Sequence, residues 1–201
     1  MSREADSAPE AALRADRAAA RAAGDPNAEL CWFATVGIDD APVTVRTLVL
    51  RDLEDSWGLF FSDQSPKGQA LARDHRLALA LWFPSLQRQW RLWGTASPLP
   101  EAVLDAHWPR KPRPAKLSDQ VQTRLGQSAP VTAAHLAETQ TAVAAEFAAV
   151  ADGDLPRPAH ANGVRLTLEG MEQLTLHRDR AHERFAYHLG AEGWAETPLV
   201  P

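Results

Sequence analysis

The sequence places a set of anion-binding side chains at the ends of predicted strands. The strand-like segment VRTLVLR carries Arg46 and Arg51, which lie five residues apart and so on opposite faces of a regular strand. An arginine within such a β-rich run is costly to bury without a partner. Arg46 therefore either pairs with one of the chain's many carboxylates or contacts an anionic ligand.

Lys67 follows the segment SDQSP at the first turn of an expected helix. The free N–H groups of such a turn, the positive end of the helix dipole, the hydroxyls of Ser62 and Ser65, and the lysine can together hold a phosphate. The alternative is that Ser65 only caps the helix, which is the more common role for any one such residue. The combination of these groups ahead of a glutamine-bearing strand favours the phosphate site.

That strand has an unusual pattern. The segment WFPSLQRQWRLWG (82–94) puts Gln89 and Trp93 on one face and Arg88 and Trp90 on the other. A half-buried strand normally has one apolar face and one polar face. Here both faces mix tryptophan with groups that need hydrogen bonds, so the Gln89 face contacts neither plain water nor a plain core.

Other catalytic chemistries lack support in the sequence. No GxSxG, HExxH or GxxxxGK[ST] motif is present, which removes the usual signs of a hydrolase, a zinc protease or a P-loop protein. His177 and His182 have no partner at metal-ligand spacing, so we expect no metal site. The single cysteine, Cys31, excludes an internal disulfide and a cysteine-based zinc site, and it fits a reducing compartment.

The composition bounds the class of protein. The chain has 201 residues, of which 45% are hydrophobic and 23% charged, as in a single globular domain. A net charge of -5 argues against binding nucleic acid through the whole surface. No apolar run approaches the roughly 18 to 20 residues that span a bilayer, and the first residues lack an apolar signal core. We therefore expect a cytoplasmic protein without a membrane or nucleic-acid partner.

The elements that position these residues are predicted to be mainly antiparallel strands. Strands are expected at 29–37, 42–53, 57–62, 76–83, 87–99 and 163–176 and as a hairpin over 183–201, and helices at 9–23, 65–75, 101–108 and 132–151. The segment IDDA is expected to turn the first hairpin and GAEG the last, and PRKPRP (109–114) is expected to be a loop. The pattern predicts one α+β domain with a central barrel at 24–201, preceded by a helical extension at 1–23.

Two separated motifs in this order resemble one known family. The segments RTLVLR, GLFFSDQSPKGQAL and LALALWFPSLQRQWRLWG, together with the closing RAHERFAYH and GWAETPLVP, are similar to the pyridoxine/pyridoxamine 5'-phosphate oxidase family of FMN-binding split barrels. The resemblance runs from about residue 24 to the C-terminus. It implies an antiparallel, Greek-key-like split β-barrel with flanking helices. It also implies a homodimer with FMN at the interface, to which the C-terminal segment contributes.

The resemblance further implies an activity, the oxidation of pyridoxine or pyridoxamine 5'-phosphate to pyridoxal 5'-phosphate with oxygen as electron acceptor. The implied FMN contacts are Arg46, Thr47, Leu48, Val49, Leu50, Arg51, Phe61, Ser62, Lys67, Gln89, Gln127, Ser128 and Arg184. The implied substrate contacts are Arg51, Arg113, Ser118, Arg180 and His182. Arg180 is expected to stabilise charge or handle a proton, and His182 to orient the substrate, so these two are the predicted catalytic residues. The Gln89 face would then contact the flavin ring.

Several positions depart from the family pattern. Arg51 stands where the family has a lysine, and Pro66 replaces an arginine that holds the FMN phosphate. The substrate-phosphate motif lacks its tyrosine in DAHWPRKPRPAKLS, where Arg113 is the nearest candidate for its arginine and Arg110 the next. The flavin-stacking tryptophan is replaced by Met171 or Leu174.

These departures leave two alternatives to the oxidase. One is a related FMN-dependent oxidoreductase that acts on another substrate, like the phenazine-pathway relatives. The other is a non-catalytic protein that binds FMN or pyridoxal phosphate.

Overall fold

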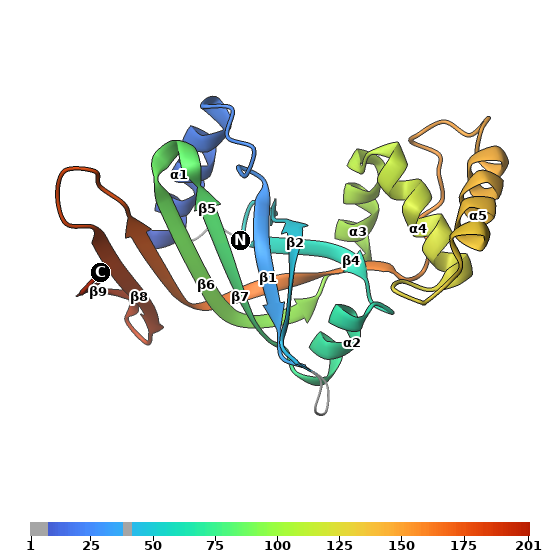
Figure 1. Cartoon of the computed structure of the whole chain (residues 1–201). Coiled ribbons are helices and arrows are strands. Elements are labelled where there is room, and N and C mark those ends of the chain that lie inside the picture. The colour runs from blue at the N-terminus through green and yellow to red at the C-terminus, as the bar shows by residue number, and fades with distance from the viewer. Residues whose placement is uncertain (1–7, 38–41) are drawn as a thin grey trace.

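The computed structural model describes residues 8–37 and 42–201, so the turn predicted at IDDA lies outside the described residues. The described strands form one curled antiparallel sheet, in the order β2-β1-β5-β6-β7-β4-β3, with β8 beside β7 and β9 beside β8 (Figure 1). The strands are β1 Leu30–Thr35, β2 Thr44–Val49, β3 Arg51–Asp52, β4 Trp57–Ser62, β5 Arg76–Phe83, β6 Arg88–Pro98, β7 Ala161–Thr175, β8 Glu183–Gly190 and β9 Gly193–Leu199. The predicted antiparallel barrel architecture is confirmed as a half-barrel with flanking helices.

The predicted hairpins form, with one difference. Strand β1 pairs with β2, β5 with β6, and β8 with β9, all antiparallel. The single strand expected at 42–53 instead splits at Leu50, whose side chain is fully buried. Strand β2 pairs with β1, whereas β3 pairs with β4. The split thus carries the chain from one edge of the sheet to the other.

The helices flank this sheet. They are α1 Ala8–Ala22, α2 Pro66–Arg73, α3 Glu101–His107, α4 Arg113–Leu125 and α5 Ala133–Glu146, with the 3-10 turns η1 Pro84–Leu86 and η2 Trp108–Arg110. Helix α4 was not predicted, because the prolines of 109–114 indicated a loop. Pro114 instead lies in the first turn of α4, where a proline does not disrupt the helix.

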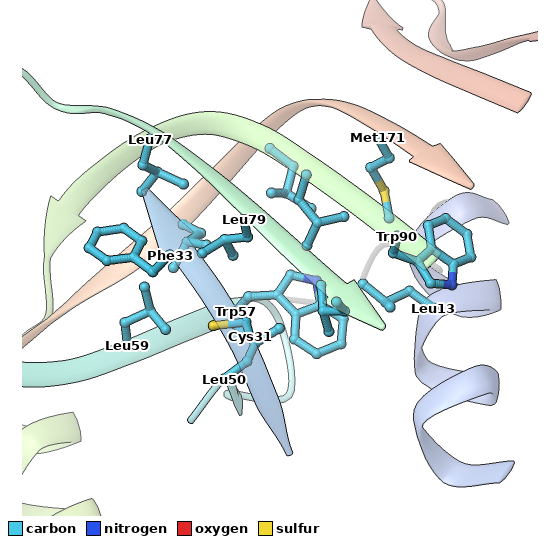
Figure 2. Close-up of a cluster of buried hydrophobic side chains, with 14 of the residues drawn as sticks. Leu13, Cys31, Phe33, Leu50, Trp57, Leu59, Leu77, Leu79, Trp90 and Met171 are labelled. Atoms are coloured by element: carbon cyan, nitrogen blue, oxygen red, sulfur yellow. The ribbon is translucent and has the colours of Figure 1, made fainter. Parts of the chain in front are cut away.

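The core fills the concave side of the sheet. Trp57 and Trp90 are its largest apolar side chains, and they pack with Phe33, Leu59 and their neighbours (Figure 2). Strand β6 alternates as expected of a strand with one buried face. Trp90 is fully buried, while Gln89 on the opposite face is only half-buried. The Gln89 face is therefore the convex, outer face of the sheet.

Helix α1 packs against the open end of this core. Leu13 is fully buried and lies beside Trp90 (Figure 2). Arg17 is 1% exposed and donates to the carbonyl oxygens of Ala28, at 3.2 Å, and Leu50, at 2.8 Å. The Trp90 indole N–H donates to Asp16 at 2.8 Å. The helix predicted as an N-terminal extension thus packs into the same core as residues 24–201.

Two further observations concern the described residues only. None of their helices has the length and apolar character needed to cross a bilayer. Nor do three or more of their His, Cys, Asp or Glu side chains come together in an arrangement that could hold a metal ion.

Candidate functional site

A cavity of about 620 Å³ lies between strands β2, β3 and β4, which belong to the two opposite edges of the curled sheet, and the segment that runs from α3 to α4. Figure 1 shows these helices beside the end of β4. The volume is within the range of sites that hold small molecules and cofactors. Its sheet wall includes Thr47, Leu48, Val49, Arg51 and Phe61, all of which are predicted FMN contacts.

Two other residues of the predicted FMN segment lie differently. Leu50 belongs to the hydrophobic core and is fully buried, so its side chain points away from the cavity. Arg46 is half-buried beside the cavity, with its guanidinium 5.8 Å from the Phe33 ring. It donates to the hydroxyls of Thr35 and Thr44. Both hydrogen-bond partners of Arg46 are therefore neutral. Of the two possibilities that the sequence left open, the ion pair with a carboxylate does not form among the described residues.

Lys67 is the buried cation of this region. Its ammonium group donates to the Ser65 hydroxyl at 3.0 Å and to the Gln127 side-chain oxygen at 3.3 Å. Burial, and next the nearby Arg46, lower the pKa of Lys67 to about 8. Asp119 opposes this shift, but it forms an ion pair with Lys111. A buried ammonium whose direct partners are neutral fits a site for an anion.

The helix start around Lys67 is built as predicted. Ser65 caps α2 by accepting the Gly68 N–H at 3.2 Å, and Pro66 occupies the first turn. The Ser65 hydroxyl donates in turn to the carbonyl oxygen of the buried Ser62. Ser65 thus both caps the helix and contacts Lys67, so the two roles left open by the sequence occur together.

Gln127 and Ser128 lie just after the end of α4, in the segment that leads to α5. The contact between Gln127 and Lys67 joins residues 60 positions apart in the chain, as the FMN prediction requires. Ser128 is exposed and has a left-handed backbone with φ of 63°. Its side chain does not line the cavity.

A second group of predicted contacts forms a row across the outer face of the sheet. Gln89 of β6 lies opposite Trp82 of β5 and opposite Leu174 of β7. Leu174 in turn lies opposite Arg184 of β8. Met171 is fully buried in the core. Of the two candidates for the missing tryptophan position, only Leu174 therefore shares a face with Gln89.

Arg184 is held in this row by an ion pair. Its Nε and Nη2 atoms each donate to a different oxygen of Glu172 at 3.0 Å. Glu172 is 8% exposed, and Arg91 lies 3.4 Å from it on the other side. The hydrogen bond to Glu172 raises the pKa of Arg184. The guanidinium is thus fixed in orientation before any ligand binds.

The two predicted catalytic residues follow β7 in the connection to β8. Arg180 is exposed and donates to Glu183 at 2.6 Å. The Nδ1 atom of the exposed His182 accepts the backbone N–H of His177 at 3.1 Å. The His177 ring lies 3.3 Å from Glu183. These contacts tie the connection to itself and leave both predicted side chains accessible.

Within one chain, the two groups do not meet. Gln89, Arg180, His182 and Arg184 are all absent from the cavity lining. In Figure 1, β8 and β9 lie at the end of the molecule opposite to α3, α4 and α5. The structure therefore brings together one group of predicted contacts at the cavity, from Arg46 to Lys67, with Gln127. A second group, Gln89 with Arg184, lies separately on the outer face of the sheet.

Arg113 and Ser118, the remaining predicted substrate contacts, also lie outside the cavity lining. Arg113 donates to the carbonyl oxygens of Phe147, at 2.6 Å, and Val150, at 2.8 Å, and to Asp152 at 2.7 Å. The exposed Ser118 donates to the carbonyl oxygen of Pro114 at 2.9 Å. Both side chains are engaged within the helical region, Arg113 with the segment that follows α5.

Other residues of the same segment line the cavity instead. They include His107, Arg110 and Lys111. Arg110 was the second candidate from sequence, whereas His107 and Lys111 were missed. No helical spacing could have found them, because His107 ends α3, Lys111 follows η2 and the next helix begins only at Arg113.

The geometry can be compared with known proteins. No protein-family model matches the chain. A pyridoxine/pyridoxamine 5'-phosphate oxidase of Alkalilimnicola ehrlichii is 34% identical over 187 residues, which cover 91% of this chain and 91% of the relative. The oxidase of the same name from Novosphingobium aromaticivorans is 35% identical over 182 residues, covering 88% of this chain and 84% of the relative.

Two solved structures share the fold. PhzG from Burkholderia lata 383, in complex with tetrahydrophenazine-1-carboxylic acid, superposes with a TM-score of 0.82 at 23% identity, covering 98% of this chain and 95% of that one. A pyridoxamine 5'-phosphate oxidase-related, FMN-binding protein from Nostoc punctiforme has a TM-score of 0.77 at 18% identity, covering 96% and 98%. With the sequence identities above, the chain belongs to the pyridoxine/pyridoxamine 5'-phosphate oxidase family, whose members are FMN-dependent oxidoreductases.

Proposed function

We propose that the protein binds FMN and oxidises pyridoxine or pyridoxamine 5'-phosphate to pyridoxal 5'-phosphate, with oxygen as the electron acceptor. The observation that carries the proposal is the pair of cations beside the cavity, Arg46 and Lys67, whose hydrogen-bond partners are neutral. A phosphate group supplies the missing negative charge for both. Family membership at 34% and 35% identity supports the same activity.

We further propose that each site is completed by a second copy of the chain. The Gln89–Arg184 row lies outside the cavity of its own chain, so a second subunit is needed to bring such a row to the cavity. Edge strand β2 supports this arrangement, because Val45 is 63% exposed and Val43, which precedes the strand, is 67% exposed. Exposed apolar side chains on an edge strand are typical of an interface, and a two-fold dimer would contain two equivalent sites.

The roles of the residues follow from their positions. Lys67, Ser65 and Arg46 would hold the phosphate, and Thr47, Leu48, Val49 and Phe61 would contact the ring system along the cavity wall. FMN, when bound, supplies the acceptor for the hydride that leaves the substrate. Gln89 and Arg184 from the second subunit would donate hydrogen bonds to the polar edge of the flavin. Arg180 and His182 of that subunit would orient the substrate and stabilise developing charge.

A direct test is the visible spectrum of the purified protein, with mass identification of what denaturation releases. We expect a yellow protein that releases FMN and consumes oxygen when given pyridoxine or pyridoxamine 5'-phosphate. Bound FMN without turnover of either compound would contradict the substrate and leave the cofactor assignment standing. A colourless protein that fails to take up added FMN would contradict both.

A second candidate is oxidation of a carboxylate-bearing ring compound. The observation in its favour is that two cations of the cavity wall are already neutralised. Lys111 pairs with Asp119, and Arg157 pairs with Glu101 and Asp105. A wall with few unpaired charges suits a monoanion better than a phosphate dianion. Turnover of tetrahydrophenazine-1-carboxylic acid, with none of the pyridoxine phosphates, would select this alternative.

FMN affinity is expected to fall as the pH rises above about 8. The phosphate binds the charged ammonium of Lys67, whose pKa is lowered to about 8 in the unliganded site. Bound phosphate would raise that pKa, so the free protein loses the proton before the complex does. In the window between the two pKa values the affinity drops by up to about tenfold per pH unit.

Fluorescence titration of FMN at several pH values checks this. Lys67→Arg is the control, because a guanidinium stays charged throughout the range. Its FMN affinity should depend far less on pH. Equal pH dependence in the two proteins would show that Lys67 is not the titrating group.

Leu174→Trp is expected to tighten FMN binding by about two- to tenfold, or about 0.5–1.5 kcal/mol. Leu174 lies in the row with Gln89, and an indole there can stack on the flavin. Met171→Trp is the matched control, because it puts the larger ring into the fully buried core and should destabilise the fold without tightening FMN. If Leu174→Trp leaves the FMN dissociation constant unchanged, the row does not face the flavin.

A further inference from the structure

Glu172 is a buried carboxylate on the outer face of the sheet, beside the Gln89–Arg184 row. It belongs to β7 and is 8% exposed. A carboxylate is costly to bury unless cations and hydrogen-bond donors compensate it. Here the compensation comes from two arginines, one on each neighbouring strand. The proposed function gives Glu172 no contact with FMN or with the substrate.

The two arginines approach the carboxylate in different ways. Arg91 of β6 lies directly opposite Glu172, and its Nη1 atom is 3.4 Å from the nearer carboxylate oxygen. Arg184 of β8 lies opposite Leu174, two residues further along β7, so its side chain runs diagonally across the sheet to reach Glu172. The residue directly opposite Glu172 on β8 is Ala186, whose methyl group leaves room for this diagonal path.

The diagonal ion pair determines which N–H groups of Arg184 stay available. A guanidinium has five N–H groups. The Nε and Nη2 atoms each donate to Glu172 at 3.0 Å, and the guanidinium has no other hydrogen-bond partner among the described residues. The two N–H groups that Nη1 and Nη2 present at the tip of the side chain are therefore free, and such a pair suits a planar acceptor edge.

The ion pair fixes Arg184 without cancelling the positive charge of this part of the face. One carboxylate balances only one of the two guanidinium groups, so the cluster of Arg91, Glu172 and Arg184 keeps a net positive charge. The Arg184 side chain is 31% exposed, so a ligand can reach its tip. A positive group at the polar edge of a flavin stabilises the negatively charged reduced form more than the oxidised form.

We propose that Glu172 is a positioning residue for FMN, because it holds the Arg184 guanidinium so that the free N–H pair at its tip binds the polar edge of the flavin. The inference rests on the proposed function, in which Arg184 contacts the flavin bound in the second subunit. Arg184 makes the contact, and Glu172 acts only through Arg184. Arg91 holds the carboxylate from the opposite side.

The first test is the affinity of Glu172→Gln for FMN, measured by fluorescence titration. The substitution keeps the size of the side chain but puts an amide NH₂ where a carboxylate oxygen accepts from Arg184. We expect the dissociation constant to rise by about five- to twentyfold. Riboflavin should weaken by the same factor, because the contact is with the ring and not with the phosphate. The matched control is Glu169→Gln, an equal charge change at an exposed residue of β7, which should leave both affinities within about twofold.

A double-mutant cycle shows whether Glu172 acts through Arg184. Arg184→Gln should weaken FMN binding by at least as much as Glu172→Gln does. When Arg184 is already glutamine, the change at Glu172 should alter the dissociation constant by less than about twofold. If the two effects multiply instead, Glu172 acts on FMN binding independently of Arg184, and the inference fails.

The midpoint potential of the bound FMN separates positioning from a purely structural or purely electrostatic role. Removal of a negative charge beside the flavin would by itself raise the potential, and a structural role would leave it unchanged. Displacement of Arg184 lowers the potential, because the reduced form loses its positive neighbour. We expect Glu172→Gln to lower it as Arg184→Gln does, by about 30 mV for each tenfold preferential loss of reduced FMN. An unchanged or raised potential would overturn the inference.

Glu172→Asp provides a second variant in which the charge is kept. Its shorter side chain moves the carboxylate back, so it no longer reaches Nε and Nη2 of Arg184 together. Positioning therefore predicts weaker FMN binding and a lowered potential for this variant also. Wild-type affinity and potential in Glu172→Asp would show that the charge alone is needed, and the inference would be wrong.

These readouts need no substrate, so they are separable from the proposed oxidation of pyridoxine or pyridoxamine 5'-phosphate. Effects of Arg184→Gln with none from Glu172→Gln or Glu172→Asp would leave the proposed contact between Arg184 and the flavin standing and remove the inference. Wild-type affinity and potential in Arg184→Gln would contradict that contact and the inference together.

Discussion

Arg180→Ala is expected to lower turnover by about 100- to 1,000-fold, or about 2.7–4 kcal/mol, while FMN stays bound. Arg180 is exposed in the connection between β7 and β8, and its only described contact is the ion pair with Glu183. The change therefore removes the group that we propose to contact the substrate, without opening the core. Steady-state oxygen consumption and the flavin spectrum of the same sample measure the two effects.

A mixing experiment tests whether Arg180 acts on a site in the other subunit. Arg51 lines the cavity, whereas Arg180 does not, so the proposed dimer takes one residue from each chain for each site. Arg51→Ala and Arg180→Ala should each be nearly inactive. In a mixed dimer, one of the two sites contains both defects and the other contains neither. If half of the dimers are mixed, about a quarter of wild-type activity should return.

The control for this experiment combines both substitutions in the same chain and mixes that protein with wild type. Its mixed dimers carry one defect in each site, so they should be inactive. Activity that does not return in the first mixture, despite subunit exchange shown by mass spectrometry, would place Arg51 and Arg180 in the same-chain site. Arg180→Ala with full turnover would remove Arg180 from the catalytic assignment altogether.

Lys67→Ala is expected to weaken FMN binding by about ten- to a hundredfold, or about 1.5–3 kcal/mol. Lys67 is 6% exposed, and among the described residues its ammonium group donates hydrogen bonds to Ser65 and Gln127 only. Removing the ammonium therefore leaves no buried carboxylate without a partner. Loss of this charge should act on the bound phosphate and much less on the folded protein alone. Fluorescence titration with FMN gives the dissociation constant.

Arg73→Ala provides the matched control, because Arg73 is an exposed cation in the last turn of the same helix. It changes the net charge equally and should leave FMN affinity within about twofold. Riboflavin, which lacks the phosphate, provides a second comparison. Its affinity is measured for the wild type and for Lys67→Ala. If Lys67→Ala weakens riboflavin as much as FMN, the lysine does not contact the phosphate.

Much of the fold could be predicted from local sequence. The alternation of residues in 76–83 and 87–99 predicted the β5–β6 hairpin, since a strand with one buried face has a period of two. Ser65 and Pro66 marked the start of α2. The prolines of 109–114 led to the prediction of a loop where α4 begins, because a proline in the first turn of a helix and a proline in a loop look the same in sequence. Helix α4 is stabilised by distant contacts, such as the one from Arg113 to the carbonyl oxygen of Val150.

The residue types of the candidate site were also readable in the sequence, because a serine-capped helix with a lysine in its first turn is a local anion motif. The sequence by itself determined the strand pattern, this motif and the family. Only the tertiary structure decided that Lys67 contacts Gln127, and that His107 and Lys111 line the cavity while Arg113 and Ser118 do not. It also decided that β8, the strand of Arg184, lies at the end of the molecule opposite to α3, α4 and α5. The physical reason is that these relations depend on which strands pair and how far the sheet curls, and contacts between distant residues set both.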